Sequence, residues 1–276
     1  MTVINTNVAS LKARVNSINA NNGMEKAMER LSSGQRINRA ADDAAGLAVS
    51  SKMTAQLKGI NMSVRNAQDG ISLVQTAEAA MAEVMNMLTR MRELGVQMNN
   101  GVYTNADRIN ANLEKNQLIA EITKVTDNTQ FNNVTLLDGS YSKELRVGNL
   151  NTEVITVTIL DMGASTLATG AAVTLSAMTI STQAGAAIAV TSLDTAISNL
   201  AEYQATLGAK QNRLEHTIAY LSNASVLTEQ ARGRIMDSDF ATESSNLAKE
   251  QILNQAATAM LAQANQSKQS LMGLIQ

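Results

Sequence analysis

The chain has 276 residues, and its 22 basic and 24 acidic side chains leave a formal charge of −2. It has no cysteine, no proline, no tryptophan and a single histidine, which excludes disulfides, thiolate nucleophiles and metal sites built from cysteines or several histidines. The near balance of charge argues against nucleic acid as a partner, because such proteins present a basic face to phosphates. Hydrophobic residues still form 45% of the chain and aromatic residues only 2%, a composition that suits long packed helices.

The composition of two segments argues against a membrane protein. The first ten residues are polar and lack the basic and apolar regions of a secretory signal, which predicts a cytoplasmic chain or export by a route that needs no cleaved signal. The window 162–193 carries no charge, but it is crowded with Thr, Ser and Gly rather than Leu and Ile. We therefore expect this window to be a surface-exposed, low-complexity segment, with no membrane insertion.

A seam of apolar residues marks the N-terminal helix. Spacings of three and four are typical of the a and d positions of a heptad, which face a partner helix. The residues that form this seam are Ile4, Val8, Leu11, Val15 and Ile18. The run skips register at 21–23 and resumes at Met24, and Gly34 can cap the helix end. Asp42 and Asp43 then offer an N-cap and first-turn acids for a second helix.

The second helix carries the strongest pattern and is predicted over about 44–98. Its seam residues are Met53, Leu57, Ile60, Val64, Ala67, Ile71, Val74, Met81, Met85 and Leu88. At ~1.5 Å per residue such a helix spans on the order of 80 Å, too long for the core of a compact globule. A shorter third helix is predicted over about 105–126, with Leu118, Ile122 and Val125 as its seam.

The middle of the chain has a different pattern. Residues 129–134 lack helical periodicity, and Asp138-Gly139 is typical of a hairpin turn. The run 153–160 is rich in β-branched residues, so we predict strands there. For 163–191 the composition leaves strand and loop open.

Helical periodicity returns in the C-terminal part. The first of two helices has the seam Leu193, Ile197, Leu200, Leu207, Leu214, Ile218 and Leu221. The second begins near Ser238, with the seam Leu253, Ala257, Met260, Ala264 and Leu271.

These elements predict a mainly α fold: a long antiparallel coiled-coil-like helical rod with terminal arms and a small central β-rich insert. The expected segments are an N-terminal arm (1–38), N-terminal rod helices (39–130), a surface-exposed β-rich insert (131–190), a C-terminal rod helix (191–236) and a C-terminal arm (237–276). The two arms are natural partners because their seams match. The seams are rich in alanine and bury little area, so we expect the arms to be unfolded in an isolated monomer and to become ordered against copies of themselves.

No catalytic constellation emerges. The chain contains neither of the two common glycine-rich phosphate loops. His216 flanks a helical seam without a recognisable nucleophile, and the acids at 42–43 and 237–239 fit helix caps better than a metal or acid–base pair. We expect no enzyme activity, no cofactor and no metal.

Several ordered motifs lie in both ends of the chain. Near the N-terminus these are Leu-Ser-Ser-Gly-Gln-Arg-Ile-Asn (31–38), Ala-Asp-Asp-Ala-Ala-Gly-Leu-Ala (41–48), Arg-Asn-Ala-Gln-Asp-Gly-Ile-Ser (65–72), Gln-Thr-Ala-Glu (75–78) and Gln-Phe-Asn (130–132). Further along they are Leu-Gly-Ala (207–209), Gln-Asn-Arg-Leu (211–214), Ser-Asp-Phe-Ala (238–241) and Ala-Met-Leu-Ala-Gln-Ala-Asn-Gln (259–266). Together these motifs resemble those of the bacterial flagellins, and the resemblance covers about 1–135 and 190–276.

The resemblance implies a self-polymerising subunit of the flagellar filament. It implies arms in an inner tube, rod helices around them and the insert facing outward, in an extracellular filament used for swimming. The implied partners are further copies of the chain, a flagellin-specific export chaperone on about 238–276, the type III export apparatus that passes the unfolded chain, the filament cap and the hook-junction proteins.

The resemblance also implies the animal Toll-like receptor for flagellin as an outside partner. Arg90, Leu94 and Glu121 occupy the positions that the family uses, whereas Thr89, Met91 and Gly95 depart from the usual pattern. The same residues could instead serve packing between subunits. Two alternatives to the filament subunit are a hook–filament junction protein, which shares arms and export route, and a signalling coiled coil.

Overall fold

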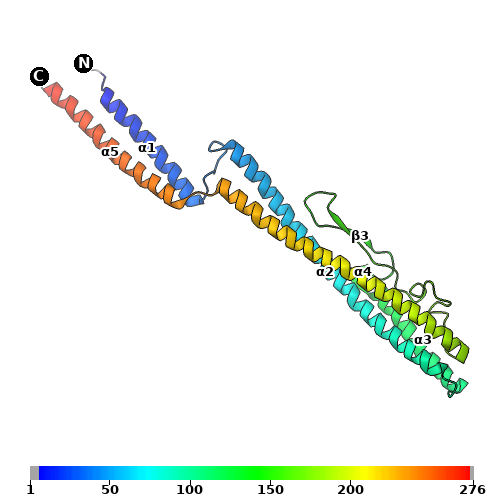
Figure 1. Ribbon diagram of the computed structural model, residues 1–276. Helices are drawn as coiled ribbons and strands as arrows, with labels where there is room; N and C mark the ends of the chain where they lie inside the picture. Colours follow the sequence, from blue (N-terminus) through cyan, green and yellow to red (C-terminus); the bar gives the residue numbers. More distant parts are fainter. Residues whose placement is uncertain (1–5, 274–276) are drawn as a thin grey trace. The chain divides into compact units, whose positions relative to one another are not determined.

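The protein is described by a computed structural model over residues 6–273, with side chains described through Ser267. Five helices carry most of it: α1 (Val8–Ser33), α2 (Ala44–Asn99), α3 (Asn105–Asn128), α4 (Gln183–Met236) and α5 (Phe240–Gly273). Four short strands lie between α3 and α4: β1 (Gln130–Phe131), β2 (Val134–Thr135), β3 (Ser142–Arg146) and β4 (Val154–Thr158). The mainly helical fold with a small β insert is confirmed, as Figure 1 shows.

The chain divides into two compact units. One comprises 1–57 and 226–276 and is called the arm unit, and the other comprises 58–225 and is called the central unit. The division falls within α2 and within α4, so each of these helices contributes to both units.

Helices α2, α3 and α4 enclose the core of the central unit. Fully buried positions follow the predicted seams, among them Val74, Met81 and Leu88 of α2 and Leu193, Leu200 and Leu207 of α4. Ile122 of α3 is also fully buried. The seam predictions hold here because a heptad of large aliphatic side chains has to be removed from water.

The segment between β4 and α4 corrects one expectation. Met162, Leu167, Leu175, Met178 and Ile180 are all at most 3% exposed and pack into the core, so the expectation of a surface-exposed segment is wrong for these side chains. Residues 163–182 form turns and loop, and α4 begins at 183 rather than near 191.

Polar side chains from α3 and α4 hold that segment in place. Lys115 of α3 is 2% exposed and donates from Nζ to the carbonyl oxygen of Met178 at 2.5 Å. Burial lowers the pKa of Lys115, because desolvation disfavours its charged form. Asn112 accepts from the Ile180 N–H at 3.2 Å, and Asn199 of α4 donates to the Leu167 carbonyl oxygen at 3.0 Å.

The structure contains two hairpins, and neither has its turn at the predicted residues. β1 pairs with β2, and β3 pairs with β4, both antiparallel. The β1–β2 turn is made by Asn132 and Asn133, whose φ angles of 49° and 61° match the positive φ that a tight hairpin turn requires. Asp138-Gly139 is therefore not a hairpin turn. It makes a local turn, with Asp138 Oδ1 accepting from the Ser140 N–H, in the connection between the two sheets.

Candidate assembly interface

Helices α1 and α5 of the arm unit lie side by side and antiparallel. The N-terminal end of α1 meets the C-terminal part of α5, where Asn7 Nδ2 donates to the Ala264 carbonyl oxygen at 3.0 Å. In the middle, Ser17 Oγ contacts Asn254 Oδ1 at 3.2 Å. The predicted pairing of the two arms is thus present in the structure (Figure 1).

The face of α1 toward α5 consists of small residues. Ala13, Ala20 and Ala27 are 3–7% exposed and stand seven residues apart, the spacing of one heptad position. On α5 the buried members are Glu243 and Ala257. We call this contact the inner face. Small side chains let the two helix backbones approach closely.

The large apolar residues of α1 form a different face. Val8, Leu11, Val15 and Ile18 are 48–54% exposed. Val15 is two residues beyond Ala13, and Ile18 is two residues before Ala20, which places each pair roughly 200° apart around a helix of 3.6 residues per turn. These four side chains, which we call the outer stripe, therefore point away from α5.

This arrangement corrects the predicted seam. The expectation that the outer stripe packs on the C-terminal arm is wrong, because the alanine positions take that contact. On α5, Ala257 is buried and Ala264 half-buried as predicted for a seam, whereas Leu253 and Met260 are 45% and 64% exposed. Ile4 and the side chain of Leu271 lie outside the described residues.

A groove of about 690 Å³ runs between the two arm helices. Its lining includes Ala9 of α1 and Ala256, Leu253 and Met260 of α5, so the exposed members of the predicted α5 seam form one of its walls. Lys12 and Glu250 also line it. Glu250 reaches α1 opposite Gly23, where an added Cβ would lie 2.9 Å from the Glu250 Cδ.

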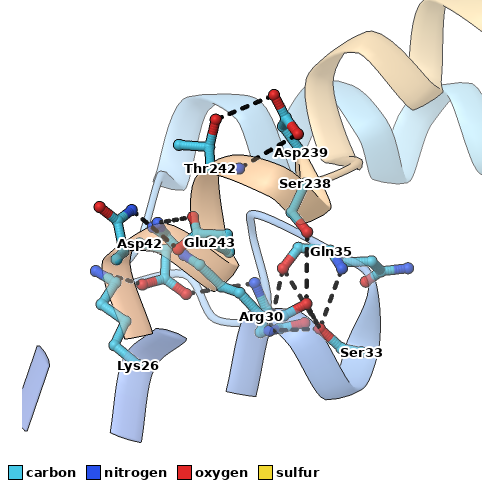
Figure 2. Close-up of polar contacts among 11 residues, drawn as sticks. Lys26, Arg30, Ser33, Gln35, Asp42, Ser238, Asp239, Thr242 and Glu243 are labelled. Carbon is cyan, nitrogen blue, oxygen red and sulfur yellow. Dashed lines mark hydrogen bonds and ion pairs between the residues drawn. The ribbon is translucent and has the colours of Figure 1, made fainter. Parts of the chain in front are cut away.

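Charged side chains fix the other end of the helix pair. Arg30 of α1 and Glu243 of α5 form an ion pair at 2.9 Å, with side-chain exposures of 22% and 9% (Figure 2). Such a buried pair is costly to break from one side, because the remaining charge would be left without a partner. Glu243 thereby fixes the register of α5 on α1.

The segments that connect the arms to α2 and α4 are joined at the same place. Gly34 ends α1 with a φ of 69°, and the backbones of Gln35 and Asp237 form an antiparallel bridge. Lys26 of α1 binds Asp42 at 3.0 Å. The hydrogen bond from Lys26, together with backbone N–H donors, lowers the pKa of Asp42.

Of the predicted caps, Asp43 and Asp239 are confirmed, whereas Asp42 accepts from the backbone N–H groups of Asn38 and Arg39 and the first turn of α2 holds no acid. Asp43 Oδ1 accepts from the Gly46 N–H at 2.8 Å at the start of α2. Asp239 Oδ1 accepts from the Ala241 N–H at 2.9 Å, and the hydroxyl of Thr242, followed by this N–H, lowers the pKa of Asp239 (Figure 2). These acids serve the helix ends rather than a catalytic centre.

Of the three positions suggested for a receptor, two are exposed and one is buried. Arg90 is half-exposed and binds Glu114 of α3 at 2.9 Å, a contact that raises the pKa of Arg90. Glu121 is exposed and lies 3.5 Å from Lys124. Leu94 is only 3% exposed, so the expectation that it is an accessible interface residue is wrong: it lies on the core side of α2 with Met91 and Met98.

Two other kinds of site are absent from the described residues. No group of three or more His, Cys, Asp or Glu side chains is placed to hold a metal ion there. No helix in that part of the chain is long and apolar enough to cross a membrane.

Comparison with protein families places the paired arms in a known context. The bacterial flagellin N-terminal helical region matches residues 4–142, and the bacterial flagellin C-terminal helical region matches residues 190–275. The chain belongs to the bacterial flagellin family. It is a structural subunit of the bacterial flagellar filament and assembles into a homopolymer.

Individual relatives agree with this family. The chain is 46% identical over 275 residues to flagellin of Halalkalibacterium halodurans and 41% identical over 302 residues to flagellin of Bacillus subtilis, with 99% of each chain covered in both cases. It is 39% identical over 284 residues to the flagellar filament 33 kDa core protein of Treponema phagedenis, again with 99% of each chain covered. These matches favour the filament subunit over the junction protein and the signalling coiled coil.

Solved structures show the same helical fold. The crystal structure of Bacillus cereus flagellin matches with a TM-score of 0.50 and 31% identity, covering 57% of this chain and 88% of that one. A putative flagellar hook-associated protein from Vibrio parahaemolyticus matches with a TM-score of 0.59 and 13% identity, covering 71% and 100%. The second likeness concerns the fold alone.

Proposed function

We propose that the two faces of the arm helices have separate tasks in the filament. The inner face joins α1 to α5 within a subunit, and the outer stripe with the groove receives neighbouring copies. The observation that carries this proposal is the exposure of Val8, Leu11, Val15 and Ile18, each about half open to solvent on one side of one helix. A row of large apolar side chains is costly to leave in water and fits the apolar groove of another copy.

The outer stripe also has a natural boundary. Its heptad frame continues from Ile18 to Asn22, Glu25 and Glu29, which are polar. The apolar half of α1 is thus the half toward the chain's N-terminus. We place the contact between copies on this half, and the fixed connection to α2 on the polar half.

A matched pair of variants tests the proposal. Val15→Ser with Ile18→Ser removes half of the outer stripe, and Asn22→Ser is the control on the same face. Purified subunits are seeded with short filament fragments and followed by sedimentation and electron microscopy. We expect long filaments from the control and none or few from the double variant, while both keep the melting curve of the central unit. Normal filaments from the double variant would refute the proposal.

The same proposal extends to the segments of the chain. We propose an N-terminal arm over 1–38, rod helices over 39–130, an insert over 131–190, a second rod segment over 191–236 and a C-terminal arm over 237–276. Export of the unfolded chain to the exterior by the flagellar type III system is supported by the absence of cysteine and proline, since neither cross-links nor slow prolyl isomers would delay unfolding and refolding.

Further partners are proposed for specific surfaces. A chaperone on the C-terminal arm is supported by four exposed apolar side chains of α5: Phe240, Ile252, Leu253 and Met260. Such a surface invites premature association before export. We also propose contacts with the filament cap and the hook-junction proteins, which the membership of the flagellin family supports. For the animal Toll-like receptor, we retain Arg90 and Glu121 as contact residues and exclude Leu94.

A further inference from the structure

The dipeptide Asn-Gly occurs twice in the chain, at 22–23 and at 100–101. In this dipeptide the glycine backbone nitrogen can attack the asparagine side-chain amide, because no Cβ shields that nitrogen. The two copies lie in different surroundings, so the structure separates a reactive site from an unreactive one.

Asn22-Gly23 lies in the interior of α1. The Gly23 N–H belongs to the helical ladder, in which each N–H donates to the carbonyl oxygen four residues earlier. The nitrogen reaches the side-chain amide only after the helix opens locally, which costs free energy.

Asn100-Gly101 lies in the turn between α2 and α3. Asn100 is exposed, and the neighbouring Val102 is 84% exposed, so water reaches the turn. Gly101 N–H donates to no acceptor among the described residues. The Val102 N–H donates to Asn100 Oδ1 at 3.2 Å, which holds the side-chain carbonyl across the Gly101 peptide and makes its carbon more electrophilic.

A buried cation stands beside this turn. Arg108 is 6% exposed and makes no ion pair within the described part of the chain. Its Nη2 donates to the Asn100 carbonyl oxygen and its Nε to the Met98 carbonyl oxygen, both at 2.9 Å. A guanidinium at this position stabilises negative charge that develops on the Asn100-Gly101 unit during reaction, and afterwards stabilises a carboxylate at position 100.

We propose that Asn100 is a site of spontaneous deamidation in the folded protein. The Gly101 nitrogen bonds to Asn100 Cγ and loses its proton to water, water returns a proton to Nδ2, and the bond from Cγ to Nδ2 breaks, so that ammonia leaves and a cyclic imide forms. Water then opens the imide. Attack at Cγ gives aspartate, and attack at the backbone carbonyl carbon gives isoaspartate. No electron transfer is needed.

The chain provides its own control once α1 is folded. Seeded filaments, in which we expect α1 to be helical, are incubated at neutral and mildly alkaline pH, digested and analysed by mass spectrometry for acid and isoaspartate at both asparagines. We expect conversion at Asn100 to exceed that at Asn22 by at least ~10-fold, which corresponds to about 1.4 kcal/mol of additional barrier at Asn22. In concentrated urea the ratio should approach one.

Two variants keep the test independent of folding. Gly101→Ala adds a Cβ whose nearest neighbour lies 3.9 Å away, so it should fold normally and convert more slowly at Asn100. Arg108→Gln removes the cation and should also slow conversion. Equal conversion at the two asparagines in the folded chain, or none at Asn100, would overturn the proposal.

Discussion

The paired arm helices should fold only when subunits assemble. The alanine side chains of the inner face are small, and burial contributes about 0.8 kcal/mol per CH₂ group, whereas ordering one residue costs about 1–2 kcal/mol in backbone entropy. The outer stripe of α1 remains half-exposed in a single subunit. The missing stabilisation therefore has to come from neighbouring copies, as in other segments that fold on binding.

The expected gain in helical residues on assembly follows from the bounds of α1 and α5. The 26 residues of α1 and the 34 residues of α5 make 60 of the 276, or about 22% of the chain. Far-UV circular dichroism of the same preparation before and after seeded assembly should show a gain equivalent to about these 60 helical residues. Amide hydrogen exchange should place the newly protected residues in 8–33 and 240–273. A monomer that already has full helicity and protected arm amides would refute the reasoning.

Two further predictions concern the central unit. Leu88→Ala, at a position with 0% exposure, should lower its free energy of unfolding in urea by about 2–5 kcal/mol, and Thr89→Ala on the exposed neighbour should change it little. The Thr104 hydroxyl holds the pKa of Asp107 below its ordinary 3.8, so this stabilisation is present above that pH and is lost as the pH falls through the lower, folded value. In acid unfolding, the variant Asp107→Asn should lack the loss of stability that comes from protonating Asp107. An acid-unfolding profile identical to that of the unchanged chain would contradict this prediction.

Much of the central unit could be predicted because its signals are strong and local. Helix α2 ends at 99 against a predicted 98, since its heptad of apolar residues, interrupted only at Glu78, runs as far as Leu88 and the sequence Asn-Asn-Gly at 99–101 marks the end of the helix. Helix α4 starts eight residues before the expected 191, because only small residues, Ala186 and Ala189, continue its seam N-terminal to Leu193 and they are a weak signal. Ala186 and Ala189 are nonetheless fully buried there.

The burial of segment 162–182 could not be predicted from its composition. Its buried apolar residues are separated by Thr, Ser and Gly at irregular spacings, so no periodic pattern reveals them. What fixes the segment is remote in sequence: Lys115 and Asn112 bind its backbone from α3, and Asn199 does so from α4. Contacts of this kind depend on the assembled fold and not on the local sequence.

In the arm helices, apolar spacing indicates which residues of α1 form a contact surface, but it predicts the wrong contact partner for them. The spacing of Val8, Leu11, Val15 and Ile18 correctly indicates a helix that needs a partner, but spacing alone does not say which one. A subunit of a polymer has two kinds of partner, its own chain and its copies. In this protein the smallest side chains face the chain's own α5, and the largest remain available. That distribution is the reverse of a monomeric helix pair, where the largest side chains would be buried first, and it is what a subunit stabilised chiefly by its neighbours requires.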